Sequence, residues 1–186
     1  MNRTRNSFPA LIQRQDSLLV IVDVQDKLTP FIPDTPQIVK NIIKLVRLAR
    51  LVDVPVLLSE QENLGETVDD IRSELKETRP LRKLAFSCFG EDAFVRRLKA
   101  HDRRTLILAG IEAHICVAQT ALQAPPEYRI AVVADAVASR ASLNRDAALA
   151  RLRENEVTIV STEMLMFEWL ERAGTDTFRA ALPLLK

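Results

Sequence analysis

Short apolar runs alternate along the chain with longer segments in which apolar residues recur at helical spacing. The first run, at residues 18–22, is apolar at every position, which is typical of a strand covered on both faces of a sheet. Further runs with the length and composition of strands lie at residues 54–59, 84–87, 105–109, 129–134 and 157–161. The pattern therefore predicts six strands.

Segments with helical spacing separate these predicted strands. Within residues 36–53, Ile38, Ile42 and Leu45 recur at intervals of three and four residues, so one face of a helix carries them. Further helices are predicted at residues 91–100, 113–123, 143–155 and 162–172. Residues 64–82 are polar and ambiguous, and we interpret them as a helix followed by a loop.

The alternation of strands and helices predicts an α/β fold, with βαβ units and a parallel sheet covered by helices on both faces. A length of 186 residues suits one domain over residues 1–186. Its first residues, about 1–15, form an N-terminal arm that is either flexible or packed. In open parallel sheets, ligands bind beyond the carboxyl ends of the strands, so the residues that follow each strand are the candidates for a site.

Composition narrows the class of protein and its partners. The net charge of +1 gives no electrostatic reason to expect nucleic acid or a membrane as a partner. No apolar run approaches the ~20 residues that span a bilayer, and residues 1–9 lack the apolar region of a secretory signal. The two cysteines, Cys88 and Cys116, fit a reducing compartment better than a disulfide framework. We therefore expect a cytoplasmic protein.

Cys116 lies where a helix is predicted to begin, just after the predicted strand 105–109 and a tight turn at Gly110. A thiol at a helix N-terminus faces the positive end of the helix dipole, which stabilises the thiolate and lowers the thiol pKa. The thiolate is the nucleophilic form, so this placement suits covalent catalysis. The alternative is an inert thiol, because free cysteines are among the most buried residue types.

Asp23 and Lys83 complete a chemically coherent set with Cys116. Asp23 follows the first predicted strand and could be a base, a metal ligand or a helix cap; no G-x-G-x-x-G run of a dinucleotide site follows it. Lys83 precedes the third predicted strand, where a solvated lysine is the ordinary alternative. Together, Asp23 could accept the thiol proton, Lys83 could orient Asp23 and favour the thiolate, and Cys116 could attack a carbonyl. Backbone N–H groups of residues 110–116 would then stabilise the oxyanion.

Three motifs, in this order along the chain, resemble those of the isochorismatase-like cysteine hydrolase superfamily. They are Asp-x-Gln at Asp23 and Gln25, Lys-x-x-x-Ser-x-Phe at Lys83, Ser87 and Phe89, and Gly-Ile-x-x-x-x-Cys-Val-x-x-Thr-Ala from Gly110 to Ala121. Within the superfamily, the chain is most similar to the isochorismatase domain-containing proteins. The resemblance implies a three-layer αβα sandwich with a six-stranded parallel sheet of Rossmann-like topology, and a homo-oligomer.

The resemblance also implies roles for individual residues. It implies Cys116, Asp23 and Lys83 as a catalytic triad that works through a thioester acyl-enzyme. It further implies a cis peptide bond between Ile111 and Glu112, which would aim the backbone N–H groups of Glu112 and Cys116 at the substrate oxygen.

Two departures from better-known members narrow the expected reaction. Nicotinamidases hold a metal with histidines after the second strand, where this chain has Ser-Glu-Gln-Glu-Asn at residues 59–63; we therefore expect no metal and no cofactor. True isochorismatases lack the nucleophilic cysteine that this chain has. The reading that remains is a hydrolase of an amide, carbamoyl or related C–N bond in a small molecule. A catalytically silent or regulatory scaffold and a redox-sensing thiol stay open as alternatives.

Further residues near the expected strand ends are candidates for lining a substrate pocket. They are Gln25, Leu28, Glu60, Gln61, Phe86, Ser87, Phe89, His114 and Ile115. For the polar members the alternative is an ordinary surface loop, and for the aromatic members it is core packing. His114 lies two residues from Cys116 and points in a different direction, which favours a hydrogen-bonding role at the pocket rim over a role as base. Trp169 lies in an apolar helix, which favours the core or a subunit contact.

Overall fold

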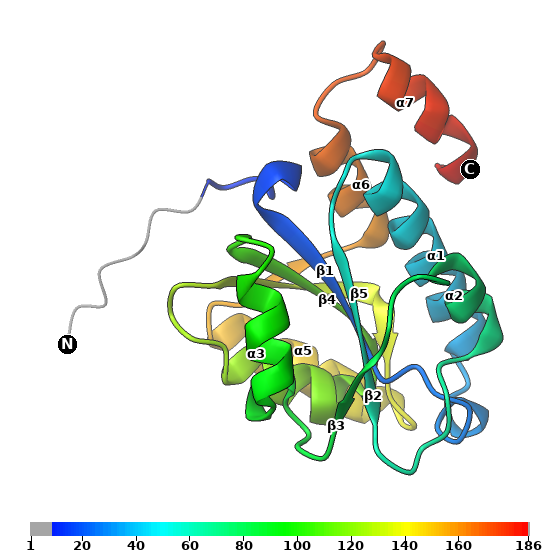
Figure 1. The fold of residues 1–186 in the computed structure, drawn as a ribbon, viewed down its shortest axis with the longest axis vertical. Coiled ribbons are helices and arrows are strands. Elements are labelled where there is room, and N and C mark those ends of the chain that lie inside the picture. Colours follow the sequence, from blue (N-terminus) through cyan, green and yellow to red (C-terminus); the bar gives the residue numbers. More distant parts are fainter. Residues whose placement is uncertain (1–8, 186) are drawn as a thin grey trace.

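Residues 9–185, which the computed structural model describes, form a six-stranded parallel sheet (Figure 1). Its strands are β1 (Ser17–Val22), β2 (Val56–Gln61), β3 (Leu81–Lys83), β4 (Thr105–Ile111), β5 (Arg129–Ala138) and β6 (Thr158–Val160). They lie in the order β3-β2-β1-β4-β5-β6, and every neighbouring pair is parallel. This is the strand order of a Rossmann-like doubly wound sheet, so the predicted fold class is confirmed.

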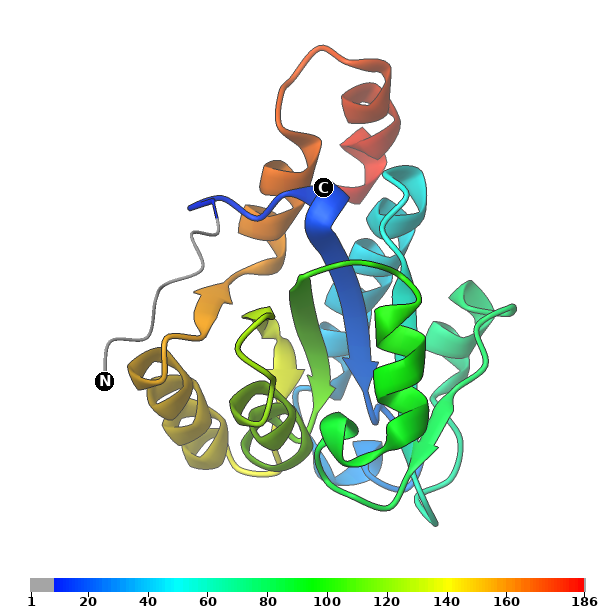
Figure 2. The same ribbon diagram turned by 60° about the vertical axis from the view of Figure 1, so that its left-hand side comes forward.

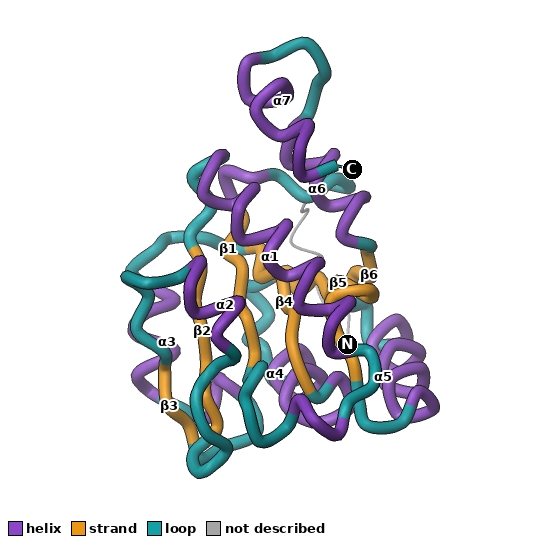
Figure 3. Tube along the Cα trace, turned by 90° about the vertical axis from the view of Figure 1, so that its right-hand side faces the viewer, coloured by secondary structure: helices purple, strands orange, loops and turns teal. Residues whose placement is uncertain are grey.

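Helices cover both faces of the sheet (Figure 3). One face carries α1 (Thr35–Leu51), α2 (Asp69–Glu74) and α6 (Thr162–Leu170), with α7 (Asp176–Ala181) at the C-terminal end; the other carries α3 (Asp92–Lys99), α4 (Ala118–Leu122) and α5 (Ser142–Glu154). Side chains of β1 alternate between the two faces. Leu19 and Ile21 pack in the apolar core under α1 and α6, and Leu18 and Val20 pack in the apolar core under α3, α4 and α5. Burial on both faces explains why residues 18–22 are apolar throughout.

Some predicted boundaries are wrong, and the third strand is the one that matters for the site. The strand is Leu81–Lys83 rather than residues 84–87. Leu81 and Lys83 are buried, whereas Leu84 is 74% exposed. The chain leaves the sheet after Lys83 and turns around its side chain, whose ammonium donates to the carbonyls of Ala85 and Phe86. An apolar residue that follows an edge strand can therefore be mistaken for part of the strand.

Three other segments differ from the predicted pattern or extend it. The helix predicted at residues 113–123 begins as a π-helical turn, Ala113–Val117, before α4. The ambiguous segment 64–82 contains α2, and β5 continues to Ala138 across an irregularity in its pairing with β4.

The described part of the N-terminal arm, residues 9–15, packs on the domain, while residues 1–8 of the predicted arm lie outside the described residues. Ile12 is buried, and its backbone N–H donates to Glu168 Oε2 at 2.6 Å. The Arg129 guanidinium donates to the backbone carbonyls of residues 9–11. At the other end of the chain, Trp169 is fully buried and its indole N–H donates to Ser17 Oγ at 3.1 Å, as expected of a core residue.

The sheet reverses its winding between β1 and β4, which lie side by side with their arrowheads at the same end (Figure 2). In such sheets the ligand crevice opens at this point, beyond the carboxyl ends of the strands. Gly110 allows the two strands to approach: it has φ +124°, and a Cβ there would lie 2.1 Å from the carbonyl oxygen of Val22. A side chain at residue 110 would therefore force β4 away from β1. The approach brings Asp23 and the turn after β4 to the same edge.

Candidate active site

Asp23 is the first residue after β1 and is held from two directions. It is completely buried and has a left-handed backbone with φ 52°, a conformation uncommon for a residue other than glycine and concentrated at functional sites. Its Oδ1 accepts a hydrogen bond from Ser59 Oγ at 2.7 Å, and its Oδ2 lies 2.6 Å from Lys83 Nζ in an ion pair. Strands β2 and β3 thus fix the carboxylate.

Lys83 ends β3 with its ammonium surrounded by acceptors. Besides Asp23, Nζ donates to Gln61 Oε1 at 2.7 Å, to the Phe86 carbonyl at 3.0 Å and to the Ala85 carbonyl at 3.2 Å. Burial alone lowers the pKa of Lys83, but the charge and hydrogen bond of Asp23 outweigh it, so the pKa lies above its ordinary value. A buried charge is tolerated only when it is paired and hydrogen-bonded. Lys83 is therefore a fixed cation beside the Asp23 carboxylate.

Cys116 lies in the π-helical turn after β4 and faces the same ion pair. It is buried, with 7% of its surface exposed, and its thiol interacts with the charges of both Asp23 and Lys83. The three side chains follow or end strands β1, β3 and β4, far apart in sequence, and the sheet order brings them together. The arrangement places a thiol, a carboxylate and an ammonium group together at the carboxyl edge of the sheet.

The expectation of a lowered thiol pKa is wrong. Burial, and next the negative charge of Asp23, raise the pKa of Cys116 to about 12, and the Lys83 ammonium opposes this only in part. The thiol is therefore protonated at neutral pH. A nucleophilic step would need a base that removes the proton as the thiol attacks. Asp23 Oδ2 accepts no hydrogen bond from residues 9–185 besides its ion-pair contact, and Asp23 interacts with the thiol, so its carboxylate is the candidate base.

The raised pKa predicts how Cys116 responds to iodoacetamide. Far below its pKa, the thiolate fraction rises about tenfold per pH unit, so the alkylation rate should rise with that slope from pH 7 to pH 10. The measurement is the rate of carbamidomethyl incorporation at Cys116, read by peptide mass spectrometry. The alkylation rate of Cys88, which is only 1% exposed, serves as the internal reference. A rate that levels off below pH 9 would contradict a pKa of about 12.

The turn after β4 is braced by the loop after β5. The Ile111–Glu112 peptide bond is cis, which is the geometry that the resemblance implies. Glu112 Oε1 accepts hydrogen bonds from the Arg140 backbone N–H at 3.1 Å and from Arg140 Nε at 2.9 Å. His114 Nδ1 lies 2.9 Å from Ser139 Oγ. This bracing agrees with a hydrogen-bonding role for His114 and fixes the backbone that leads to Cys116.

Gln25 and Glu60, two of the residues predicted to line the pocket, form hydrogen bonds within the fold. Gln25 is fully buried; it donates to the carbonyls of Gln61 and Gly65 and accepts from the Gln61 N–H. Glu60 Oε1 accepts from both the backbone N–H and the hydroxyl of Thr67 at 2.8 Å. Both residues therefore organise the loop after β2. Their polarity reflects backbone groups that need partners.

The other predicted pocket residues divide between packing and exposure. Ser87 Oγ accepts from the Phe89 N–H at 3.2 Å and caps a 3₁₀ turn, and the Phe89 ring meets the edge of Phe94 with centroids 5.3 Å apart. Leu28 and Ile115 are partly buried against the two apolar cores. Phe86 differs from these: its side chain is 54% exposed, and its carbonyl binds Lys83.

Ser59 is a site residue that sequence reasoning passed over. It ends up beside Asp23 because it is in register with Val22 in the neighbouring strand. The available signal was a small hydroxyl residue within an otherwise apolar strand run, at the level where the first strand ends.

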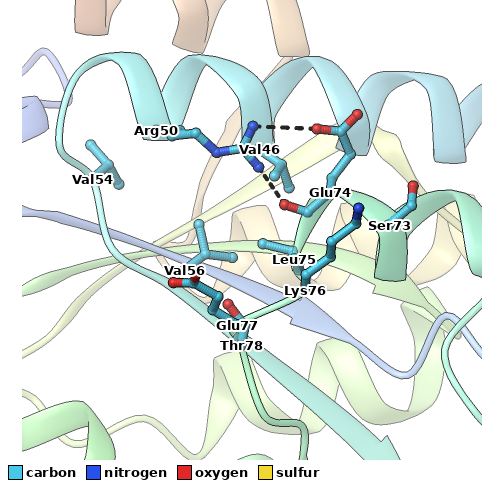
Figure 4. A pocket seen from close by; sticks show the side chains of 10 residues that line it. All are labelled: Val46, Arg50, Val54, Val56, Ser73, Glu74, Leu75, Lys76, Glu77 and Thr78. Atoms are coloured by element: carbon cyan, nitrogen blue, oxygen red, sulfur yellow. Dashed lines mark hydrogen bonds and ion pairs between the residues drawn. The ribbon is translucent and has the colours of Figure 1, made fainter.

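A cavity of about 560 Å³ lies elsewhere, between α1, α2 and the beginning of β2 (Figure 4). Its apolar lining comes from Val46, Val54, Val56 and Leu75, and its rim from Arg50, Ser73, Glu74, Lys76, Glu77 and Thr78. Arg50 is paired with Glu74 across it. Val56 begins β2 whereas Ser59 and Gln61 lie toward its carboxyl end, so this cavity is separate from the candidate active site.

No group of three or more His, Cys, Asp and Glu side chains in residues 9–185 is arranged to hold a metal ion. Within the same part of the chain, no helix has the length and apolar character to cross a membrane.

The Rossmann-like sheet and its cysteine, aspartate and lysine define a protein of the isochorismatase class. The isochorismatase domain matches residues 17–164, and the chain therefore belongs to the isochorismatase family. Isochorismatase domain-containing protein 2A of Mus musculus is 33% identical over 176 residues, which cover 92% of this chain and 84% of the mouse protein.

Two solved structures share the fold. The MAR1 ribonuclease from Caenorhabditis elegans is 28% identical with a TM-score of 0.86, over 95% of this chain and 92% of that one. The YcaC gene product of Escherichia coli, described as an octameric hydrolase of unknown specificity, is 22% identical with a TM-score of 0.86, over 97% and 91% of the two chains.

Proposed function

We propose that this protein is a metal-independent cysteine hydrolase that cleaves an amide, carbamoyl or related C–N bond of a small molecule. Membership of the isochorismatase family supports a hydrolase. The observation that carries the proposal is the meeting of the Cys116 thiol with the Asp23–Lys83 ion pair at the crevice of the sheet. A thiol, a buried base and a fixed cation are the parts that acyl transfer to cysteine requires.

In the first half-reaction, Cys116 Sγ attacks the substrate carbonyl carbon while its proton passes to Asp23 Oδ2. The carbonyl oxygen becomes an oxyanion, which the backbone N–H groups of Glu112 and Cys116 stabilise. When this intermediate collapses, the C–N bond breaks and the leaving nitrogen takes the proton from Asp23. The products of this half-reaction are a free amine and a thioester on Cys116.

In the second half-reaction, water attacks the thioester carbonyl and gives a proton to Asp23. The C–S bond breaks, Cys116 leaves as a thiolate and recovers the proton from Asp23, and a carboxylic acid is released. Lys83 keeps its proton throughout, in line with its raised pKa. Its charge holds Asp23 in place and stabilises the transient thiolate.

The proposed partners follow from charge and from the structural neighbours. We propose a small-molecule substrate rather than a nucleic acid, since the net charge is only +1. The octameric Escherichia coli neighbour supports a homo-oligomer. Free thiols at Cys88 and Cys116 fit a reducing compartment, and we propose the cytoplasm.

The test is a panel of small amides, carbamoyl compounds and activated esters, assayed with and without EDTA. We expect at least one compound to be hydrolysed, and we expect its turnover to be unchanged by EDTA, because the mechanism uses only side chains and backbone. Activity that EDTA abolishes and an added divalent metal restores would contradict the metal-independent mechanism. A panel with no turnover and no Cys116 adduct would favour a non-catalytic scaffold.

A further inference from the structure

Asp23 follows β1 and Lys83 ends β3; these two strands are not neighbours, because β2 lies between them. Ser59 and Gln61 are two residues apart in β2, so their side chains lie on the same face of the strand. Ser59 is in register with Val22, the residue before Asp23, and Gln61 is in register with Lys83. The side chain of Ser59 donates to Asp23 and that of Gln61 accepts from Lys83, so β2 bridges the two halves of the ion pair.

The contact between Ser59 and Asp23 is the more deeply buried of the two. Ser59 is 1% exposed and Asp23 is fully buried. Ser59 holds Asp23 twice: its carbonyl accepts the Asp23 backbone N–H at 3.2 Å, and its hydroxyl donates to Oδ1 at 2.7 Å. With Oδ1 engaged, Oδ2 is the oxygen left to face Lys83.

We propose that Ser59 is a positioning residue: its hydroxyl fixes the Asp23 carboxylate so that Oδ2 receives the proton of the Cys116 thiol. This inference rests on the proposed hydrolase function. Without the hydroxyl, the carboxylate can rotate about its Cβ–Cγ bond, and Oδ1 is left buried without a partner. When the base is displaced from the line of proton transfer, the rate of the chemical step falls although the substrate contacts are unchanged.

The kinetic test compares Ser59→Ala with Ser59→Thr, which restores the hydroxyl. For Ser59→Ala we expect kcat, per active site titrated through Cys116, to fall about 10–100-fold with KM unchanged. We expect Ser59→Thr to recover most of the loss. Ser73→Ala removes a hydroxyl from α2, remote from the site, and is the matched control with wild-type kcat. Wild-type kcat in Ser59→Ala, or an equal loss in the alanine and threonine variants, would overturn the proposal.

A second measurement does not depend on turnover. In a crystal structure of Ser59→Ala we expect the Asp23 carboxylate to leave its wild-type orientation or to occupy two, with the backbone of residues 22–24 unmoved. A single unchanged orientation would overturn the positioning role. If the wild type hydrolyses nothing in the panel, the hydrolase function fails, and this crystallographic result still decides whether Ser59 fixes Asp23.

Discussion

Replacement of Asp23 by asparagine is expected to slow turnover while making Cys116 more reactive toward iodoacetamide. The loss follows because asparagine cannot take the thiol proton, and general-base catalysis contributes about 10²–10⁴-fold. The gain follows because Asp23 raises the thiol pKa through its charge, whereas Lys83 lowers it. Removing the carboxylate leaves the cation acting alone. A thiol pKa lowered by one unit gives about ten times more thiolate at pH 7.

Lys83→Met is the control variant for this prediction, because it removes the opposite charge from the same ion pair. It should slow alkylation of Cys116, since the thiol then faces the Asp23 carboxylate alone. Circular dichroism and melting curves must show that both variants fold, because breaking a buried ion pair costs about 3–5 kcal/mol of stability. If Asp23→Asn retained turnover, or if both folded variants slowed alkylation, the proton-acceptor role of Asp23 would be wrong.

Replacement of Cys116 by alanine is expected to abolish hydrolysis. Loss of the nucleophile from a group that acts as a unit costs about 10⁴–10⁶-fold in kcat. Substrate binding should persist, since the crevice keeps its other side chains. Fluorescence or calorimetric titration of the variant measures this.

Cys88→Ala is the matched control, because Cys88 is also a buried free thiol. Burial, followed by the charge of Asp23, raises its pKa, and its backbone N–H binds Thr120 Oγ1 in the core. This variant is expected to hydrolyse the substrate and to form the adduct at Cys116. Full activity in Cys116→Ala, or loss of the adduct in Cys88→Ala alone, would contradict the assignment of the nucleophile.

The sheet could be predicted because its central strands are buried on both faces. Residues 18–22 and 106–109 are apolar at every position for that reason, and they lie in β1 and β4. The short edge strand β3 could not be delimited in this way. Its buried residues include Lys83, whose burial depends on a distant carboxylate, whereas the apolar Leu84 that follows is exposed. Such an ion pair between residues far apart in sequence cannot be predicted from the local hydrophobicity of the chain.

The sequence could suggest which residues belong to the candidate site, but not the electrostatics of that site. Cys116, Asp23 and Lys83 could be grouped by their chemistry and by the family resemblance, although the predicted third strand begins after Lys83 rather than ending at it. The direction of the Cys116 pKa shift could not be predicted, because it depends on how deeply the thiol is buried and on how close Asp23 lies to it. The hydrogen bonds of Gln25 and Glu60 to the loop after β2 could not be predicted either, because sequence alone does not distinguish a side chain that binds backbone from one that binds substrate.

The central claim is that Cys116 carries the acyl group during turnover, and peptide mass spectrometry tests it directly. The wild-type protein is quenched in acid while it hydrolyses an activated ester or amide and is then digested with trypsin. Cys116 and Cys88 fall on different peptides, because residues 105–129 and 84–96 are separate tryptic products. We expect the mass of the acyl group to appear on peptide 105–129, and we expect hydroxylamine to remove this group. Two results together would contradict the claim: an acyl group on a different peptide of the wild type, and full turnover in Cys116→Ala.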